Sequence, residues 1–255
     1  MIDLHSHILP GLDDGVESLS AAVELARSAL RDGITVIAAT PHVRDDYPTS
    51  ADEMERALED TRAALAAEGV PLELLAGGEI ALDRLSLLEE DELHRFALGG
   101  SKQALLLEFP YFGWPLGLEQ TVFELRVRGW RPVLAHPERN NEVQASVGRL
   151  AHLVEAGALI QLTAASLDGR LGRTTRATAL RLVKFGHAHL IGSDAHAPSL
   201  REVGLSAAAA AVGDPVLARW LTVDVPRAIV DDAPLGARPS GRTRRRLWKR
   251  RAGAE

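Results

Sequence analysis

One arrangement recurs five times along the chain: a helical stretch ends at a glycine, and a short apolar, β-branched run follows at once. The five glycines are Gly33, Gly69, Gly129, Gly157 and Gly186. Glycine just past a helix adopts the left-handed conformation that closes the helix without steric cost. Apolar runs that alternate with helices are typical of a parallel sheet covered on both faces. We therefore expect an α/β fold.

Seven apolar runs are predicted as the strands of this sheet. They are residues 2–5, 34–39, 70–75, 104–109, 130–135, 158–160 and 187–191. The run Ser50-Ala51-Asp52-Glu53 is a capping box and predicts the start of a helix that reaches Glu68. Periodicity does not distinguish a closed barrel from an open doubly wound sheet. A chain of 255 residues is long enough to form either as one domain.

Metal-binding side chains follow six of the seven predicted strands, at the point where each strand ends. The runs are His5-Ser6-His7, Thr40-Pro41-His42, Gly77-Gly78-Glu79, Glu108-Phe109-Pro110, His136-Pro137-Glu138-Arg139 and Ser193-Asp194-Ala195-His196. The sixth strand, which ends near Gln161 and Thr163, carries no strong ligand. The carboxyl ends of parallel strands meet at one end of a barrel, where barrel enzymes hold their catalytic residues. This pattern favours a barrel with a site at its mouth.

The first two strand ends illustrate the chemistry and its alternatives. Residues i and i+2 of a strand point the same way, so His5 and His7 can bind one cation together. Asp14 lies in a loop that can fold back over the mouth. Asp13 competes for the same role, and an acid at this place could also be a simple turn or capping residue.

Two glutamates follow strongly apolar runs, where an unpaired carboxylate would be costly to bury. A metal would remove that cost at Glu79 and Glu108, and a buried ion pair with an arginine is the alternative. The full set of candidate ligands comprises His5, His7, Asp14, His42, Glu79, Glu108, His136, Asp194 and His196. Nine ligands suit two or three ions. Three divalent ions would bring +6 against −4 from the four acids, which leaves a pocket ready for an anion such as phosphate.

Composition excludes several other kinds of chemistry and location. The chain has no cysteine, which excludes disulfides, thiolate–zinc sites and a cysteine nucleophile. Without sulfur ligands, manganese, iron and zinc are all acceptable. A net charge of −6 argues against nucleic acid as a partner. No run of about 20 apolar residues could span a bilayer, and the N-terminus does not have the pattern of a signal peptide, so we expect a cytoplasmic protein.

The remaining four histidines are not expected to take part in the site. His94 and His152 lie in helical stretches with charged neighbours and are predicted to be exposed. His187 and His189 open the seventh strand, at the end of the barrel remote from the site.

The C-terminal segment differs in charge from the rest of the chain. Eight basic residues lie between Arg238 and Arg251, and Glu255 is the one acid after them, so this segment carries +7 and the remainder −13. Prolines and glycines between 234 and 241 mark a joint. We predict a catalytic domain over residues 1–232 and a basic, flexible tail over residues 233–255. The tail is either a solvated extension or a contact for an anionic membrane surface or an acidic partner.

The six strand-end motifs, in this order, resemble the polymerase-and-histidinol-phosphatase (PHP) superfamily. Within it the chain is most similar to the manganese-dependent protein tyrosine phosphatases encoded with bacterial capsule and exopolysaccharide genes. The runs that carry this likeness also include Asp13-Asp14-Gly15, Gly78-Glu79-Ile80 and Leu107-Glu108-Phe109-Pro110. The resemblance implies a distorted TIM-like barrel of seven β/α units. It also implies hydrolysis of phosphotyrosine on a protein, for which the tail of a bacterial tyrosine kinase is the expected substrate.

The resemblance further implies how the ligands are shared among three divalent ions, with manganese expected. His5, His7, Glu79 and Asp194 would hold the first ion. Glu79 would bridge to a second ion held also by Glu108 and His136, and Asp14, His42 and His196 would hold the third. Arg139 and Arg201 fit the places of two arginines that bind the substrate in such enzymes. The residue after Arg139 is Asn140, where relatives often have an aromatic residue, which puts a ring contact there in doubt.

The loop of residues 109–115 concentrates aromatic side chains beside Glu108 in a chain that is only 4% aromatic. It would either wall the ring of a substrate, with Tyr111 as a contact, or pack beneath itself; Tyr47 is a second candidate wall. The alternatives to the tyrosine phosphatase are a histidinol-phosphate phosphatase or another PHP-type phosphoesterase of small molecules, a nuclease or proofreading module, and a barrel that uses metal for stability alone.

Overall fold

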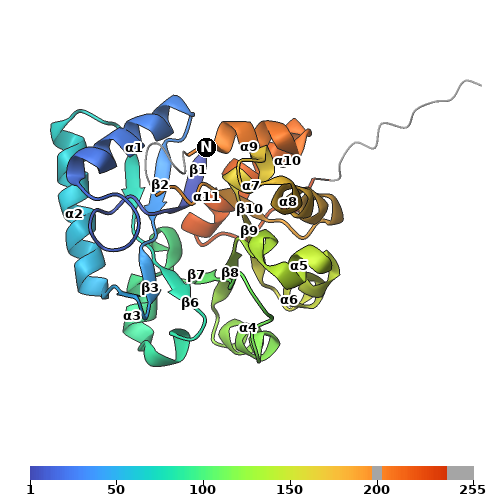
Figure 1. Ribbon diagram of the computed structural model, residues 1–255. Helices are drawn as coiled ribbons and strands as arrows, with labels where there is room; N and C mark the ends of the chain where they lie inside the picture. The colour runs from blue at the N-terminus through green and yellow to red at the C-terminus, as the bar shows by residue number, and fades with distance from the viewer. Residues whose placement is uncertain (197–202, 240–255) are drawn as a thin grey trace, which may run out of the picture.

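Seven parallel strand positions form the centre of the computed structural model, which describes residues 1–196 and 203–239 (Figure 1). Within these ranges each predicted strand is present to within a few residues. The strands are β1 (Ile2–Ser6), β2 (Val36–Ala39), β5 (Glu73–Leu75), β7 (Ala104–Glu108), β8 (Arg131–Ala135), β9 (Leu159–Thr163) and β10 (Leu190–Gly192). The predicted α/β class is therefore confirmed.

Two of the strand positions are broken in the middle, which the sequence did not predict. After β2 the chain makes a short break at Thr40-Pro41 and continues as β3 (His42–Arg44), and after β5 it continues as β6 (Glu79–Ala81). As a result β1, β2 and β5 form one sheet, and the other runs in the order β10-β9-β8-β7-β6-β3-β4. The added strand β4 (Tyr47–Pro48) pairs with β3 in the antiparallel direction.

The seven positions close into a distorted barrel because β1 also contacts the segment after β10. The backbone N–H of Asp194 donates to the carbonyl of His5 at 2.8 Å, and that of His7 donates to the carbonyl of Ala195 at 2.8 Å. These bonds join the first and last strands exactly where two predicted ligand motifs lie. The choice of a barrel over an open sheet is thereby confirmed.

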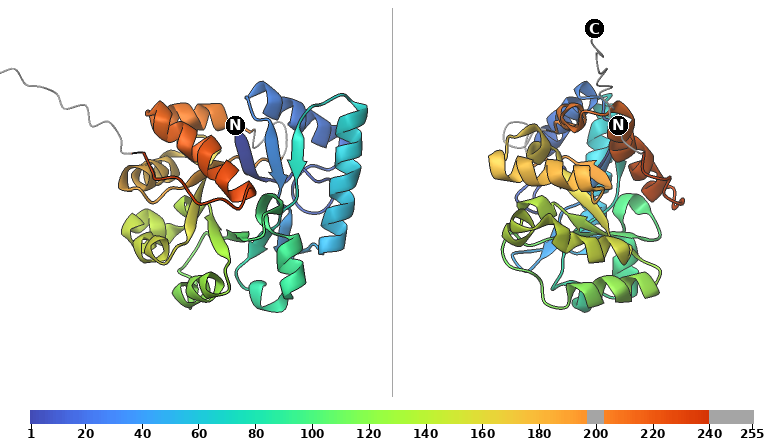
Figure 2. Two further views of the ribbon diagram at one scale, coloured as in Figure 1. Left: turned by 180° about the vertical axis from the view of Figure 1, so that it is seen from behind. Right: turned by 90° about the vertical axis from the view of Figure 1, so that its right-hand side faces the viewer.

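Helices cover the outside of the strands, as the views from behind and from the side show (Figure 2). The α-helices are α1 (Leu19–Arg31), α2 (Ala51–Ala67), α3 (Glu90–Arg95), α4 (Leu118–Val127), α5 (Asn141–Ala145), α6 (Ala151–Glu155), α7 (Ala164–Asp168), α8 (Arg173–Phe185), α9 (Leu205–Val212), α10 (Pro215–Arg219) and α11 (Val225–Val230). The 3₁₀ segments are η1 (Leu85–Leu87), η2 (Leu98–Gly100), η3 (Pro137–Arg139) and η4 (Val147–Leu150). The segment η5 (Trp220–Asp224) is a π-helix.

The local signals in the sequence operate as predicted. All five helix-ending glycines have a positive φ, between 62° and 99°. Ser50 accepts from the N–H of Glu53, and the Glu53 side chain accepts from the N–H of Ser50, so the capping box opens α2. Leucine, isoleucine, valine and alanine fill the space between the strands and these helices. Burial of that surface is the main stabilising contribution to the fold.

The beginning of the predicted tail lies against the barrel. Trp220 Nε1–H donates to the carbonyl of Gly236 at 3.1 Å, and Arg238 donates to the carbonyl of Val183 at 2.6 Å. Residues 240–255, which hold most of the basic charge, lie outside the described residues, so the division into a domain and a tail remains a prediction. None of the helices in residues 1–196 and 203–239 is both long enough and apolar enough to cross a membrane.

Candidate metal centre

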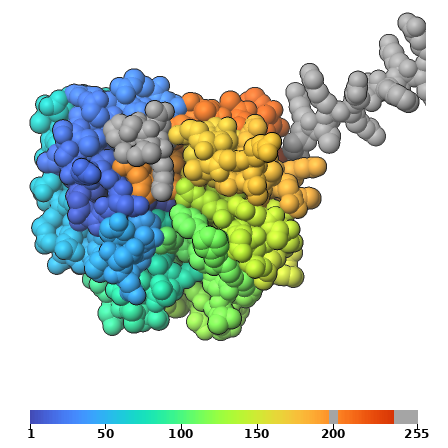
Figure 3. All heavy atoms as spheres, viewed as in Figure 1, coloured from blue at the N-terminus to red at the C-terminus, as the bar shows by residue number. Residues whose placement is uncertain are grey.

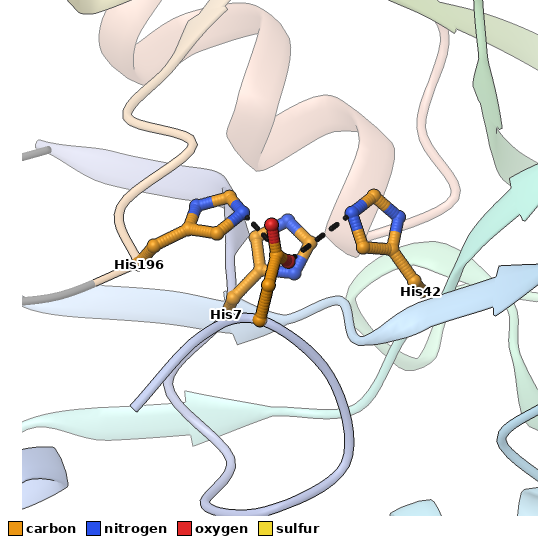
Figure 4. Close-up of side chains that lie close together, drawn as sticks. His7, His42 and His196 are labelled. Atoms are coloured by element: carbon orange, nitrogen blue, oxygen red, sulfur yellow. Dashed lines mark ion pairs between the residues drawn. The ribbon is translucent and has the colours of Figure 1, made fainter. Parts of the chain in front are cut away.

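All nine predicted ligands lie together at the carboxyl end of the barrel. They form four overlapping groups, and the possible ligand atoms of each group lie within 4.8 Å of one another: His7, Asp14, His42 and His196; His5, Glu79 and His136; His5, His7 and Asp194; and His42, Glu79 and Glu108. Figure 4 shows three of the imidazoles turned toward one another from separate segments of the chain. Asp14 and Glu108 are partly accessible, and the other seven are buried.

Glu79 lies at the middle of the cluster. Its Oε2 is 3.3 Å from His5 Nε2, 3.4 Å from His7 Nε2 and 3.1 Å from His42 Nδ1. Its Oε1 lies 2.8 Å from His136 Nε2. Burial opposes ionisation of Glu79, but the field of His5 and the contacts with His136 and His42 outweigh it and hold the pKa well below its usual value. Within the described residues Glu79 pairs with histidines and not with an arginine. This favours a metal at Glu79 over the buried ion pair with an arginine that the sequence also allowed.

Glu108 combines the two alternatives that the sequence left open for it, an ion pair with an arginine and a place among the candidate metal ligands. Its Oε1 accepts from Arg44 Nη1 at 2.9 Å, while its Oε2 lies 3.8 Å from His42 Nδ1. Arg44 also pairs with Asp46 through Nε at 2.7 Å. Burial and the nearby charge of Glu79 raise the pKa of Glu108. An arginine therefore holds one oxygen of this carboxylate, and the other oxygen faces the cluster.

The two neighbouring acids of the first loop have separate roles. Asp14 Oδ1 lies 3.2 Å from His196 Nε2 and 3.5 Å from His42 Nε2. The contact with His196 is the largest cause that lowers the pKa of Asp14. Asp13 instead lies behind the cluster: its Oδ2 accepts from His7 Nδ1 at 2.7 Å and from the backbone N–H of His42 at 2.9 Å. Asp14 is thus the candidate ligand, and Asp13 orients a candidate ligand.

The imidazoles of His5 and His7 are held so that one nitrogen of each ring remains free to bind a metal. The Nδ1 of His5 donates to Gln161 Oε1 at 3.1 Å, and the Nδ1 of His7 donates to Asp13. A proton on Nδ1 leaves the lone pair of Nε2, and these two Nε2 atoms face each other at 3.3 Å. A hydrogen bond to the second ring nitrogen is the usual support of a histidine that binds metal.

Asp194 and His136 adopt backbone conformations that residues other than glycine rarely adopt. Their φ angles are 54° and 40°, in the left-handed region. Asp194 Oδ1 lies 3.5 Å from both His7 Nε2 and His196 Nδ1, and Arg139 Nη1 lies 2.8 Å from its Oδ2. Strained backbone of this kind is concentrated at functional sites because the surrounding structure holds it there.

Three buried polar residues support the cluster and were not predicted. Gln161, in the middle of β9, the strand without a strong ligand, also accepts from the backbone N–H of His136 at 3.3 Å. Asp3 accepts from the backbone N–H groups of His5 and Ser193, and burial raises its pKa to about 6. Glu138 is fully buried too. Its Oε1 accepts from the backbone of strand β9 and from a serine of α7.

A signal for these supports existed in the sequence. Asp3 lies two residues before His5 on the same face of β1, and Gln161 lies near the predicted end of the sixth strand. Glu138 lies inside the motif that also contains His136 and Arg139. The types of these residues did not separate a ligand from a support.

Arg139 and Tyr111 lie beside the cluster, as the sequence placed them. Arg139 Nη1–H donates to the Tyr111 hydroxyl at 3.2 Å, and the guanidinium lies 5.7 Å from the ring centroid. The Tyr111 ring is 5.8 Å from that of His136. Tyr111 therefore supplies an aromatic contact to Arg139 although the next residue is Asn140. The predicted second arginine, Arg201, lies outside the described residues.

Some of the aromatic side chains near the mouth pack within the loop, and others lie beside the cluster. Phe109 is buried and packs edge-on against Trp114, with ring centroids 5.7 Å apart, whereas Tyr111 is 42% exposed toward the mouth. Tyr47 is stacked on His42, with centroids 5.9 Å apart. Phe109 and Trp114 thus pack together, while contact of Tyr111 with a substrate ring stays a prediction.

The other four histidines lie where the sequence placed them. The side chains of His94 and His152 are 52% and 84% exposed, as predicted. His187 and His189 precede β10 at the opposite end of the barrel. None of the four belongs to the ligand groups found in the part of the chain that the structure describes.

The donor set fits divalent cations. Glu79 Oε2 and His42 Nδ1 are buried and have no hydrogen-bond partner within the described residues, although they lie 3.1 Å apart. Buried polar atoms without a partner are costly, and cations bound within the cluster would satisfy them. Imidazole nitrogens with carboxylate oxygens and no sulfur suit manganese, iron or zinc. A site of this composition can bind an anion and activate water.

Comparisons with known proteins agree with this geometry. The family model described as "Capsular polysaccharide synthesis, CpsB/CapC" matches residues 1–218. The tyrosine-protein phosphatase YwqE of Bacillus subtilis is 39% identical over 198 residues, which are 77% of each chain. The putative tyrosine-protein phosphatase CapC of Staphylococcus aureus is 34% identical over 197 residues, again 77% of each chain.

Solved structures also superpose on most of the chain. A crystal structure from work on YwqE of Bacillus subtilis and CpsB of Streptococcus pneumoniae, described as unique metal-dependent tyrosine phosphatases, superposes with a TM-score of 0.85 at 34% identity. It covers 92% of this chain and 96% of that one. A probable 2-pyrone-4,6-dicarboxylic acid hydrolase of Acinetobacter baumannii superposes with a TM-score of 0.53 at 14% identity, over 90% and 98% of the two chains. The second likeness concerns the fold alone.

Proposed function

Because the chain belongs to the CpsB/CapC family of capsular polysaccharide synthesis, we propose that it is a metal-dependent protein tyrosine phosphatase. The observation that carries the proposal is the meeting of five imidazoles and four carboxylates from separate strands at one end of the barrel. Two relatives, 39% and 34% identical to the chain over 77% of each chain, are named a tyrosine-protein phosphatase and a putative tyrosine-protein phosphatase. The absence of cysteine leaves a metal route to phosphotyrosine hydrolysis and excludes a cysteinyl-phosphate intermediate.

We assign the ligands to three divalent ions, and manganese is the expected metal. The first ion would be held by His5, His7, Glu79 and Asp194, the second by Glu79, Glu108 and His136, and the third by Asp14, His42 and His196. The close groups of ligand atoms support the third ion, whose ligands all belong to one group, and the first, whose His5, His7 and Asp194 form another. The ligands of the second ion are divided between two groups that share Glu79. Bound ions would lower the pKa of water to supply the nucleophile near neutral pH and would offset the charge of the phosphate.

The residues around the ions would bind and orient the phosphate ester. Arg139 lies at the mouth with its guanidinium between Asp194 and the Tyr111 hydroxyl, so it can reach an oxygen of a phosphate placed at the cluster. A guanidinium there stabilises the negative charge that develops on the equatorial oxygens. Arg201 is expected to contribute a second guanidinium. Tyr111 would pack against the substrate ring, and a phenol leaves readily enough to need no dedicated general acid.

The expected substrate is phosphotyrosine on a protein, and specifically the tail of a bacterial tyrosine kinase that controls capsule or exopolysaccharide synthesis. The names of the relatives support phosphotyrosine on a protein as the substrate, and the name of the family supports the link to capsule synthesis. The kinase tail is what the resemblance of the motifs implies. We place the enzyme in the cytoplasm, with the basic tail of residues 233–255 as a contact for the anionic inner face of the membrane.

A phosphate-release screen tests the proposed function directly. The purified chain, stripped of metal and reloaded with Mn²⁺, Fe²⁺ or Zn²⁺, would be given a phosphotyrosine peptide and, in parallel, histidinol phosphate. We expect metal-dependent release from the peptide, highest with manganese, and loss of release when a chelator is added. Turnover of histidinol phosphate alone would replace the proposal by the histidinol-phosphate phosphatase. No turnover of any phosphomonoester by the metal-loaded protein would contradict it altogether.

A further inference from the structure

A cavity of about 340 Å³ opens directly beside the metal centre, between residues 81–83 after β6 and residues 110–115 after β7. We infer that this cavity binds an apolar side chain that adjoins the phosphotyrosine in a protein substrate. The inference rests on the proposed function and adds to it a preference for the residues around the phosphotyrosine. In the space-filling view the loop of residues 110–115, in green, lies on the same face as blue segments of the N-terminal third of the chain (Figure 3).

The cavity is continuous with the candidate site because two residues belong to both. Glu108 lines the cavity and is grouped with His42 and Glu79 in the cluster. Tyr111 lines the cavity as well, and its ring is 5.8 Å from that of His136. An extended peptide advances about 3.3–3.6 Å per residue. A phosphotyrosine with its phosphate at the cluster and its ring against Tyr111 would therefore bring a neighbouring residue to the cavity.

The lining of the cavity favours an apolar side chain over an acidic one. Leu82, Ala81 and the two prolines Pro110 and Pro115 supply its apolar walls, and the carboxylates of Asp83 and Glu108 add negative charge to the lining. The cation in the lining, Arg44, already pairs with Glu108 and Asp46. An acidic neighbour of the phosphotyrosine would have to compete with those two carboxylates. An apolar side chain needs no such exchange and gains from removal from water.

The loop that forms one wall is held in place before any substrate binds. Asn140 is fully buried, and its Nδ2 donates to the carbonyls of Pro110 at 2.7 Å and Gly113 at 2.8 Å. The backbone N–H of Asn141 donates to the carbonyl of Tyr111 at 3.0 Å, and its Oδ1 accepts from the N–H of Gly113 at 2.9 Å. These four bonds tie the loop to the segment that carries the catalytic arginine. A wall that is already ordered loses less entropy on binding.

The same loop leaves two large apolar side chains in water. Phe112 is 82% exposed and Leu116 is fully exposed, whereas Phe109, at the start of the loop, is buried. Apolar side chains gathered next to a polar site are typical of a surface that binds a partner. They would extend the apolar contact of the cavity along a peptide.

Three phosphotyrosine peptides of equal length test this inference, with leucine, glycine or aspartate on both sides of the phosphotyrosine and p-nitrophenyl phosphate as the small substrate. We expect kcat/KM to be about tenfold higher for the leucine peptide than for the glycine peptide, which is the scale of an apolar contact of a few methylenes. The aspartate peptide should be the poorest.

Substitutions at one position of the wall and at a matched position outside it complete the test. In Leu82→Glu the ratio of kcat/KM for the leucine peptide to that for p-nitrophenyl phosphate should fall about tenfold, and in Leu82→Ala by less. Leu87→Glu adds the same charge five residues further on, at a side chain that is 63% exposed and does not line the cavity, and it should keep the wild-type ratio.

Equal turnover of the leucine and glycine peptides by the wild type would overturn the inference, and so would an unchanged ratio in Leu82→Glu or a preference for the aspartate peptide. These failures are distinct from failure of the proposed function. In that case neither the peptides nor p-nitrophenyl phosphate would be hydrolysed by the metal-loaded wild type.

Discussion

The two ends of the barrel differ in what they bury. At the amino end of the strands the buried residues are mostly apolar, and the chain enters five of the seven strand positions through a glycine turn. At the carboxyl end histidines and carboxylates are buried within a few ångströms of one another, with two residues in left-handed conformations. Buried charges and strained backbone are destabilising unless something compensates for them. The comparison shows that stability is concentrated at one end and chemistry at the other.

Strand β10 shows this difference along a single strand. His189 lies before the start of β10, and its Nδ1 accepts from the backbone N–H of Ile160 at 3.1 Å. Burial lowers the pKa of His189 to about 4. It is therefore neutral and structural. Asp194, after the end of the strand, is held ionised: burial opposes the charge, but Arg139 and His7 outweigh it and keep the pKa well below its usual value. The two roles thus lie at opposite ends of one strand, the structural one before its start and the candidate ligand after its end.

The largest expected effect is loss of activity at the carboxyl end. Asp194→Asn and His136→Asn should each lower kcat/KM for a phosphotyrosine peptide by more than the roughly 10- to 100-fold that loss of an outer support of a metal site costs. Asparagine is the suitable replacement because it tolerates the positive φ of both positions. Circular dichroism would check that the fold is kept. Full activity in either variant would remove that residue from the site.

The amino end should respond in stability instead. Leu105 is fully buried near the start of β7. We expect Leu105→Ala to lower the free energy of unfolding by about 2–5 kcal/mol, because the substitution leaves a cavity in the core. Urea unfolding measures this effect, and metal analysis should show unchanged stoichiometry in the folded variant. If metal-free Asp194→Asn were less stable than the metal-free wild type by as much as Leu105→Ala is, the comparison would fail.

Removal of metal should affect stability through the carboxyl end. Ions that bind only the folded chain stabilise it by about 2.7 kcal/mol at a hundredfold excess over the Kd, which corresponds to roughly 5–10 °C in Tm for a chain of this size. Chelator treatment followed by a thermal melt, with and without added Mn²⁺, measures the shift. No change in Tm across saturating metal would show that the cluster does not bind it.

Arg139 should matter for the substrate but not for the metal. Arg139→Ala should lower kcat/KM by about tenfold to a hundredfold, the equivalent of about 1.4–2.7 kcal/mol, because a charge-assisted contact to phosphate is lost. Arg139→Lys keeps the charge without the forked geometry and should recover part of the loss. Steady-state kinetics beside metal analysis would test this. Unchanged kinetics in Arg139→Ala would make it a structural partner of Asp194.

The last expected effect, which is absent at neutral pH, is a pH dependence at the amino end. The folded pKa of His189 is about 4 and its usual value 6.5, so the unfolded chain binds the additional proton between these values. Stability contributed by neutral His189 is therefore present above pH 6.5 and is lost as the pH falls toward 4, by at most about 1.4 kcal/mol per pH unit. Urea unfolding from pH 7 to 4 should show a smaller decline in His189→Gln. Identical declines would contradict the assignment.

Local signals predicted the fold well because they act over a few residues. The helix-ending glycines, the capping box of α2 and the apolar runs are each satisfied within their own segment. The breaks at Thr40-Pro41 and before Glu79 were missed, since hydropathy does not show where hydrogen bonding passes from one sheet to another. Proline has no N–H to donate to a ladder, which is consistent with the first break.

The sequence by itself determined which residues could meet, because parallel strands bring their carboxyl ends to one side whatever the details of the sheet. That rule, with the spacing of His5 and His7, named the eight members of the cluster that follow strands, whereas Asp14 lies in a loop and had Asp13 as an alternative. Only the tertiary structure separated Asp14 from Asp13, gave Glu108 an arginine as well as the cluster, and revealed Gln161 as a support. These choices depend on distances of a few ångströms between segments far apart in the chain, and no local pattern of residues contains such distances.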